Sequence, residues 1–171
     1  MEDAFAVVAG WTPVSPRLRS LRRAVLLGLL VPVGLIAAAA LGLPALLGDE
    51  AEPRTGLVTI GVVLAVAAAL AAFGWRLVGR SYLSWGYAER DDDLLVRHGW
   101  MFRRLVVVPY GRMQFVDVTA GPLERRFGLA TLQLHTAAAA TDATIPGLPP
   151  AEAARLRDTL AALGEARSAG L

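Results

Sequence analysis

The sequence of 171 residues contains no cysteine and no lysine, and it has only two histidines. The absence of cysteine excludes disulfides, thiolate metal sites and cysteine nucleophiles. All 17 basic residues are therefore arginine, and 19% of the chain is charged whereas 55% is hydrophobic. Soluble domains usually carry about 25% charged residues. This excess of apolar residues excludes a disordered chain and argues against an ordinary cytosolic enzyme.

Two stretches of the chain lack charged residues altogether, residues 24–47 and residues 55–75. A helix needs about 20 apolar residues to cross a bilayer. The sequence therefore predicts transmembrane helices at residues 24–47 and 55–78, joined by an extracytoplasmic loop at residues 48–54. The alternatives are buried core helices and a signal peptide. Core helices are rarely uncharged over about six turns, and a signal peptide has an apolar stretch of only about 7–15 residues.

The arginines are distributed unevenly around these two stretches. Four precede the first stretch and two follow the second, whereas the loop has Arg54 against three acidic residues. Because positive residues stay on the cytoplasmic side, we expect a multi-pass protein of the inner or plasma membrane with both termini cytoplasmic. Neither stretch contains an ionisable residue, which argues against a transport pathway.

Residues 1–23 are predicted to form a cytoplasmic segment with a helix next to the membrane. Ser15 followed by Pro16 is typical of a helix start. Leu18, Leu21 and Val25 then share one face of that helix. We expect the helix to begin at the cytoplasmic interface and to run into the first span. Its arginines either only fix the topology or also recognise lipid headgroups.

From residue 79 the pattern changes to short alternating runs separated by turns. Strands are expected at residues 82–89, 94–97, 105–108, Met113–Thr119 and Ala130–Thr136, with a last short strand around residues 144–145. This spacing predicts a β-sandwich or barrel. An amphipathic helix then follows Pro150, with Ala153, Leu156, Leu160 and Leu163 on one face. We expect Gly164 to end this helix and the cytoplasmic domain, residues 79–164, and residues 165–171 to form a tail.

Several sequence motifs of this domain resemble one known family. They are Val-Pro-Tyr-Gly-Arg-Met-Gln-Phe-Val-Asp-Val from Val108, Gly-Pro-Leu-Glu-Arg-Arg-Phe-Gly-Leu from Gly121, the Arg-His-Gly turn from Arg97, and a closing Ala-Ala-Arg-Leu-Arg. Together they resemble the bacterial pleckstrin-homology-like (PH-like) domain of the YdbS type. The resemblance implies an α+β protein, in which a two-helix transmembrane hairpin is followed by two antiparallel sheets and a C-terminal helix. It implies no catalytic activity.

Candidate catalytic and metal-binding residues are few. The acidic residues 91–93 lack the spacing and the glycine of a calcium loop and are expected to form a solvated turn. His98 and His135 have no partner at a metal-binding or catalytic spacing. Arg125 and Arg126 either pair with nearby acids or bind an anion, and we favour a structural role. We therefore expect no catalytic residue, no metal and no cofactor.

The segment around residue 100 combines large apolar residues with a basic rim. Its candidate contact residues are Arg97, Trp100, Met101, Phe102, Arg103 and Arg104. An apolar tip with basic neighbours suits an anionic membrane surface or a partner protein. The alternative is that the three apolar side chains pack into the barrel or against Trp85.

These features predict a non-enzymatic, membrane-anchored binding or scaffold module. We expect it to dock another membrane protein with related PH-like domains. The alternative is a sensor of anionic lipid headgroups at the cytoplasmic face, and a homo-oligomer stays open. Nucleic acid is not an expected partner, since a net charge of +2 gives no electrostatic footprint for it.

Overall fold

The computed structural model describes residues 10–47, 52–137 and 141–169. The chain divides into two compact units. We call Arg22–Gly79 the hairpin unit, and Met1–Leu21 together with Arg80–Leu171 the sheet unit.

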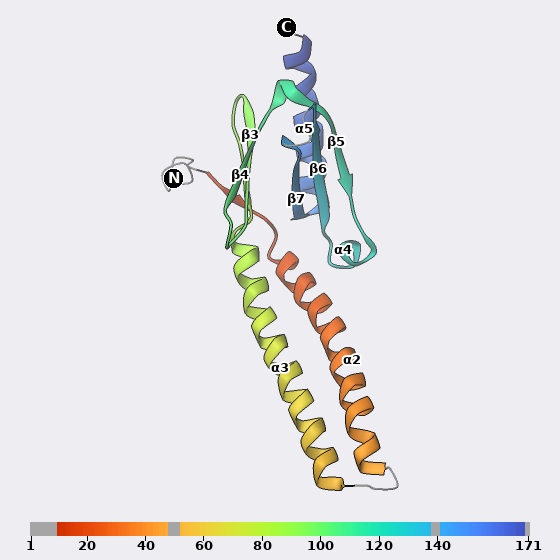
Figure 1. Ribbon diagram of the computed structural model, residues 1–171. Coiled ribbons are helices and arrows are strands. Elements are labelled where there is room, and N and C mark those ends of the chain that lie inside the picture. The colour runs from red at the N-terminus through yellow and green to blue at the C-terminus, as the bar shows by residue number, and fades with distance from the viewer. Residues whose placement is uncertain (1–9, 48–51, 138–140, 170–171) are drawn as a thin grey trace. The chain divides into compact units, whose positions relative to one another are not determined.

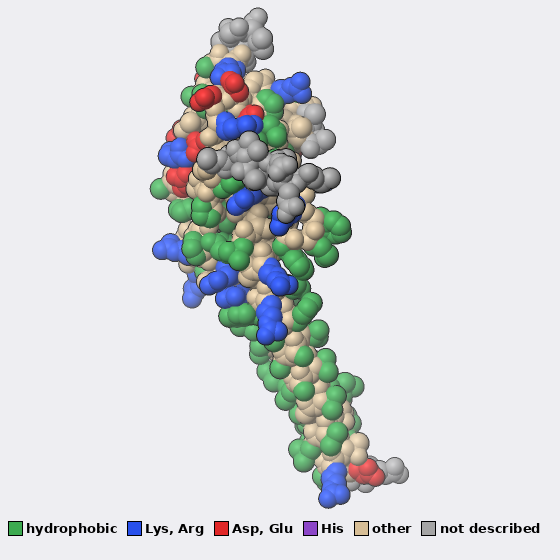
Figure 2. Space-filling view, turned by 90° about the vertical axis from the view of Figure 1, so that its left-hand side faces the viewer, with side chains coloured by type: hydrophobic (Ala, Val, Ile, Leu, Met, Phe, Trp, Pro, Cys, Tyr) green, Lys and Arg blue, Asp and Glu red, His purple; other side chains and the backbone are tan. Residues whose placement is uncertain are grey.

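The hairpin unit consists of most of two long helices, α2 (Arg17–Leu47) and α3 (Pro53–Leu83), which lie side by side (Figure 1). Both are long and apolar enough to cross a membrane. Glycines let them approach closely: a Cβ at Gly34 would lie 2.9 Å from Cβ of Ala67, and one at Gly42 would collide with Ile60. Hydrophobic side chains cover the visible face of the hairpin (Figure 2). These small residues thus allow α2 and α3 to pack closely against each other.

Both helices extend beyond the predicted spans. Pro53 and Arg54 were expected in the loop but begin α3, and residues 48–51 lie outside the described residues. At the other end α3 continues to Leu83, so the strand expected to start at residue 82 is wrong for its first four residues. The Trp85 N–H donates to the Tyr82 carbonyl in the turn that follows. Strand pairing begins only at Gly86, which has partners on both sides.

The sheet unit contains two antiparallel sheets and a C-terminal helix, which confirms the expected α+β fold. The first sheet has the order β1 (Thr12–Pro13), β2 (Gly86–Glu89), β3 (Asp93–His98) and β4 (Arg104–Pro109). The second has the order β5 (Met113–Thr119), β6 (Ala130–Thr136) and β7 (Ala143–Leu148). The short helix η1 (Tyr110–Arg112) joins β4 to β5, α4 (Pro122–Arg126) joins β5 to β6, and α5 (Pro150–Ala169) ends the domain.

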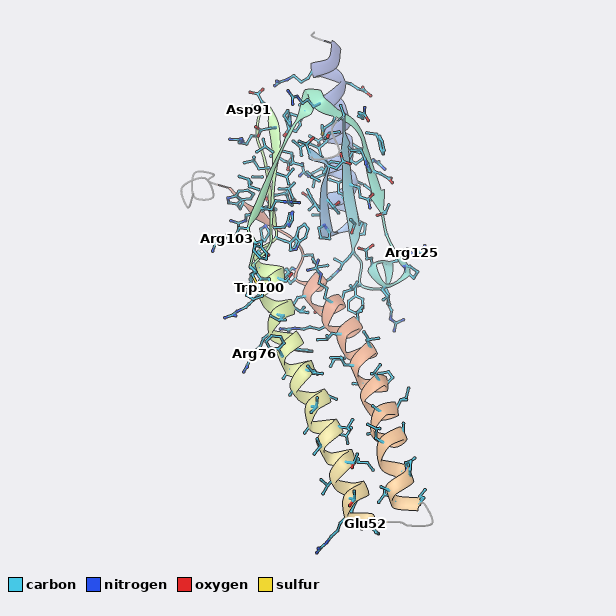
Figure 3. All side chains as sticks on the ribbon, in the orientation of Figure 1. Glu52, Arg76, Asp91, Trp100, Arg103 and Arg125 are labelled. Carbon is cyan, nitrogen blue, oxygen red and sulfur yellow. The ribbon has the colours of Figure 1, made fainter. Side chains whose placement is uncertain are left out.

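The strand registers define two ends of this unit. His98 pairs with Arg104 next to the turn at residues 99–103, whereas Asp93 pairs with Pro109 next to η1. β5 leaves η1 and runs back to α4, which follows the Thr119–Thr131 pair. The turn and α4 therefore share one end of the sheet unit, which we call the Trp100 end. Figure 3 shows Trp100, Arg103 and Arg125 at this end and Asp91 at the other.

The core of the sheet unit lies between the two sheets and α5. Leu94, Val108, Leu132 and Ile145 are fully buried there. The predicted apolar face of the last helix is confirmed, since Ala153, Leu156 and Leu160 are fully buried and Leu163 packs against the core. Burial of such side chains contributes roughly 1.5–3 kcal/mol each, so α5 is an integral part of the domain.

The segment before the first span also belongs to this core, which the sequence did not predict. Val14 and Leu18 are buried, and the Ser15 N–H donates to the Gly147 carbonyl at 2.9 Å. The Tyr82 hydroxyl donates to the Val14 carbonyl at 3.1 Å. The Ser15 cap is confirmed, because its Oγ accepts from the Arg17 N–H. The start of this helix thus places Leu18 in the core of the sheet unit.

The predicted end of the last helix at Gly164 is also wrong, because α5 continues to Ala169. A glycine inside a helix costs only about 1 kcal/mol relative to alanine. Gly164 lies close to the Tyr110 carbonyl. Arg167, one turn later, forms an ion pair with Asp92 and donates to the Asp91 carbonyl. These contacts hold the last turns in place.

A polar network fastens the start of α5 to β2. The buried Tyr87 hydroxyl donates to Glu152 at 2.8 Å, and Arg155 binds both Glu152 and Glu89 at 2.7 Å. Burial and the Glu152 carboxylate raise the pKa of Tyr87. The hydrogen bond from Arg155 lowers the pKa of Glu152 despite its partial burial. The network therefore favours the ionised form of Glu152.

Candidate functional site

The turn between β3 and β4 depends on one glycine. Gly99 has a φ of +94°, and a Cβ there would collide with the Phe102 carbonyl oxygen. Only glycine adopts this backbone without steric cost. The tight start of the turn sends the next three residues away from the strands.

Those three residues present their side chains to solvent. The exposed fraction is 41% for Trp100, 66% for Met101 and 83% for Phe102. The alternative that they pack into the core is therefore wrong. Trp85 stacks instead on His98, with ring centroids 4.9 Å apart. Large exposed apolar side chains clustered on one turn form a candidate contact surface.

A basic cleft of about 360 Å³ lies beside this turn. The last residues of α3 form one wall and the turn forms the other. The lining includes Arg80, Leu83, Ser84, Arg97, Trp100 and Arg103. Three guanidinium groups thus line the cleft, and no carboxylate does among the described residues. Arginine is the side chain best suited to bind phosphate or carboxylate groups.

Aromatic rings position two of these arginines. The Arg80 guanidinium lies 5.7 Å from the Trp100 ring centroid, and the Arg97 guanidinium lies 4.5 Å from that of Trp11. Such contacts hold a cation without neutralising it. Burial, with the nearby Arg104, lowers the pKa of His98. The positive charge of the cleft at neutral pH therefore comes from arginine.

Comparison with known proteins identifies the family. A sequence profile described as "Bacterial PH domain" matches residues 23–164. The chain belongs to this family. It is also 38% identical over 79 residues to the UPF0699 transmembrane protein YdbS of Bacillus subtilis (strain 168). That match covers 46% of this chain and 48% of the relative, so the chain spans about half the length of that relative. No solved structure matches significantly.

The match confirms the YdbS-type resemblance and the two-sheet domain, and together with the two apolar helices it supports a membrane protein. The match to the family profile starts at residue 23. The strand β1 and the start of α2, which complete the bacterial PH domain here, therefore precede the matched region. Val14 and Leu18 lie in this extra part.

The bacterial PH domain brings only some of the predicted contact residues together. Arg97, Trp100 and Arg103 line the cleft, and Met101 and Phe102 extend from the turn beside it. Arg104 begins β4 and lines a different groove. Sequence reasoning missed Arg80 as a cleft residue. Arg80 lies two positions after the predicted second span, residues 55–78, but the sequence alone does not show that it meets the turn at residues 99–103.

The second groove, of about 640 Å³, lies beside β4 and is also lined by Trp85, Val96 and His98. Residues 104–107 all line it, as do residues 141–144. Consecutive residues of a strand line a groove when its backbone edge faces that groove, because side chains alternate between the two faces. Among the strands of the described residues, β4 pairs only with β3, and β7 only with β6. The groove thus separates two unpaired strand edges of the PH domain.

Three of the other candidates, Asp92, Asp93 and His135, have structural partners. Asp93 pairs with Arg90 at 2.7 Å, and Asp92 pairs with Arg167. His135 stacks on Phe115 and lies 3.5 Å from Asp142. In the part of the chain that the structure describes, no three histidine or acidic side chains converge on a metal position.

Proposed function

We propose that this protein is a membrane-anchored, non-enzymatic binding module, and that the Trp100 end of its PH domain binds an anionic bilayer surface. The observation that carries the proposal is the exposed Trp100, Met101 and Phe102 beside a cleft lined by three arginines. The protein crosses the membrane twice with both termini cytoplasmic, as the arginine distribution supports.

The energetics favour a lipid surface over solvent for this turn. Full burial of a side chain such as Phe102 or Met101 contributes roughly 1.5–3 kcal/mol. Each arginine near an anionic leaflet adds about 1 kcal/mol. These gains are individually small. However, Arg80 follows the predicted second span, residues 55–78, by only two positions, so binding is intramolecular and even weak contacts suffice.

A fluorescent reporter on the turn tests this proposal. Because the chain has no cysteine, Phe102→Cys can be labelled uniquely with an environment-sensitive dye. The full chain is reconstituted in nanodiscs of phosphatidylcholine, with and without phosphatidylglycerol. We expect a blue-shifted emission, shielded from aqueous quenchers, only with the anionic lipid. Phe115→Cys, at another exposed aromatic position on β5, is the control and should stay quenchable.

Charge reversal tests the electrostatic part. Arg103→Glu combined with Arg104→Glu should abolish the shielding of the label at position 102. High salt should weaken it, because the Debye length falls from about 10 Å at 0.1 M to about 3 Å at 1 M. Arg112→Glu, at the η1 end, is the matched control and should leave it intact. A label that remains quenchable in anionic nanodiscs would refute the proposal.

The topology is tested separately. A cysteine at Glu52 should react with a membrane-impermeant maleimide in intact cells. A cysteine at Arg112 should react only after the membrane is opened. The reverse pattern would place the PH domain on the outer side.

A second candidate function is docking of another membrane protein, and the groove beside β4 favours it. Unpaired strand edges bind extended segments by adding a strand. A photo-crosslinker at Val107, which is exposed and lines the groove, should give one adduct of constant mass in intact cells. The same crosslinker at Gln114, on exposed β5, is the control. Equal adducts from both positions would argue against a docking site.

A further inference from the structure

The short helix α4 has features that a structural connector does not require. Leu123 is 52% exposed, and Arg125 and Arg126 are exposed beside it. Within the described residues neither arginine forms an ion pair. Like the turn at residues 99–103, this segment combines an exposed apolar side chain with exposed arginine.

Glu124, the acidic residue of α4, has a hydrogen-bond partner on each of its carboxylate oxygens. One Glu124 carboxylate oxygen accepts from the Gly121 N–H at 2.9 Å, and the other accepts from the Thr131 hydroxyl at 2.7 Å. The Glu124 carbonyl accepts from the Leu129 N–H at 2.8 Å. Glu124 therefore fixes the shape of the segment and leaves Arg125 and Arg126 available to bind an external anion. The expected pairing of these arginines with Glu124 is not formed.

A third cation lies against the same segment. Gly128, directly after α4, has a φ of +63°, and a Cβ there would lie 3.1 Å from the Arg17 guanidinium. Arg17 also belongs to the sheet unit. In the sequence it precedes the first predicted span, residues 24–47, by only seven positions. The basic cluster at α4 thus adjoins the point at which the chain leaves the sheet unit for the membrane.

The cluster lies at the Trp100 end of the sheet unit. β4 leads from the turn to η1, and β5 leads from η1 back to α4, so the two sheets each present one basic, apolar connection at the same end. Figure 3 shows Arg125 and Trp100 at this end, on different elements. A single contact would leave the domain free to rotate about it, whereas two separated contacts define its orientation.

We infer that α4 is a second contact with the anionic bilayer, in which Leu123 enters the interface and Arg17, Arg125 and Arg126 bind lipid phosphate groups. Charge complementarity carries this inference, together with the position of α4. It rests on the proposed function, since both require the Trp100 end to meet the bilayer. It adds a contact on the second sheet, and its residues are tested independently of those of the turn.

The test uses the full chain with Leu123→Cys as the only labelled position, in the same two kinds of nanodisc. We expect shielded, blue-shifted emission with phosphatidylglycerol and quenchable emission without it. Arg125→Gln with Arg126→Gln should shift the equilibrium of the label at position 123 toward solvent by about 25-fold, at about fivefold per arginine. The same pair should change the label at position 102 far less. Phe115→Cys is again the solvent control.

Each outcome decides between the two proposals. If position 123 stays quenchable while position 102 is shielded, the inference is overturned and the proposed function stands. If both positions stay quenchable, both fail. Shielding of position 123 alone would support the inference and refute the role of the turn. Shielding that is the same in neutral nanodiscs, or is unchanged by the double glutamine variant, would overturn recognition of anionic lipid by α4.

Discussion

The substitution Leu18→Ala tests whether the segment before the first span is part of the PH domain. Leu18 is only 3% exposed and belongs to the core of the sheet unit. Replacing a buried leucine by alanine costs about 2–5 kcal/mol, and more when the cavity cannot collapse. Gly147 has no side chain to fill the space beside Leu18, and its backbone is held by the Ser15 N–H. We therefore expect a cost in the upper half of this range.

The measurement needs a soluble form of the domain. In it, a flexible Gly/Ser linker replaces residues 22–79, which lie between the neighbouring strands β1 and β2. For a domain of this size the free energy of unfolding falls by about 1–3 kcal/mol per molar urea. Leu18→Ala should then lower the urea midpoint by about 1–5 M. A form that starts at Arg80 lacks residues 10–21 and with them the buried side chains of Val14 and Leu18. Because typical domains are stable by only about 5–15 kcal/mol, this form should lose cooperative unfolding.

Arg19→Ala is the matched control, because Arg19 is exposed on the next position of the same helix. Exposed substitutions usually change stability by less than about 0.5 kcal/mol. If Leu18→Ala and Arg19→Ala shifted the midpoint equally, residues 10–21 would not be part of the folded domain, and the reasoning would be refuted.

Three further predictions follow from other contacts. Gly147→Ala should lower the urea midpoint of the linked domain, because its φ is +74° and a Cβ would lie 2.7 Å from Leu18 Cβ. The pKa of Glu152 is lowered in the folded state from its ordinary value of 4.5. Ionised Glu152 therefore stabilises the folded state above that pH. This stabilisation is lost as the pH falls through the lowered pKa of the folded state. Acid unfolding of Glu152→Gln should accordingly be less steep in that range than unfolding of the parent. Gly42→Val should destabilise the hairpin, since a Cβ at Gly42 would collide with Ile60; a lower thermal midpoint in detergent checks this.

Strong periodic patterns made the helices and most strands predictable. The uncharged stretches identified α2 and α3, and strict alternation located β5 and β6 at their observed bounds. The alternation at residues 82–85 was misleading, because a helix also places Tyr82 and Trp85 close together. At the boundary between α3 and β2, the Tyr82 hydroxyl donates a hydrogen bond to the Val14 carbonyl. These two residues are remote in the sequence, so the contact could not be predicted from the local pattern.

The candidate site was predictable in composition but not in arrangement. The run of arginines and large apolar residues at 97–104 is visible in the sequence, and the exposure of Phe102 agrees with it. The cleft is not visible, because Arg80 reaches it from another element. Likewise, the neighbours of Arg125 suggested an ion pair with Glu124. Two partners from elsewhere, the Gly121 N–H and the Thr131 hydroxyl, occupy that carboxylate instead.

The place of the hairpin within the chain has a consequence for assembly. Thr12 pairs with Tyr87 in neighbouring strands, yet both long apolar helices lie between them in the sequence. In the proposed two-span topology, the two strands can meet only because an even number of crossings returns the chain to the same side of the membrane. A chain that inserts only one helix leaves β1 and β2 in different compartments, with Val14 and Leu18 missing from the core. In the proposed topology, pairing of β1 with β2 therefore depends on insertion of both helices.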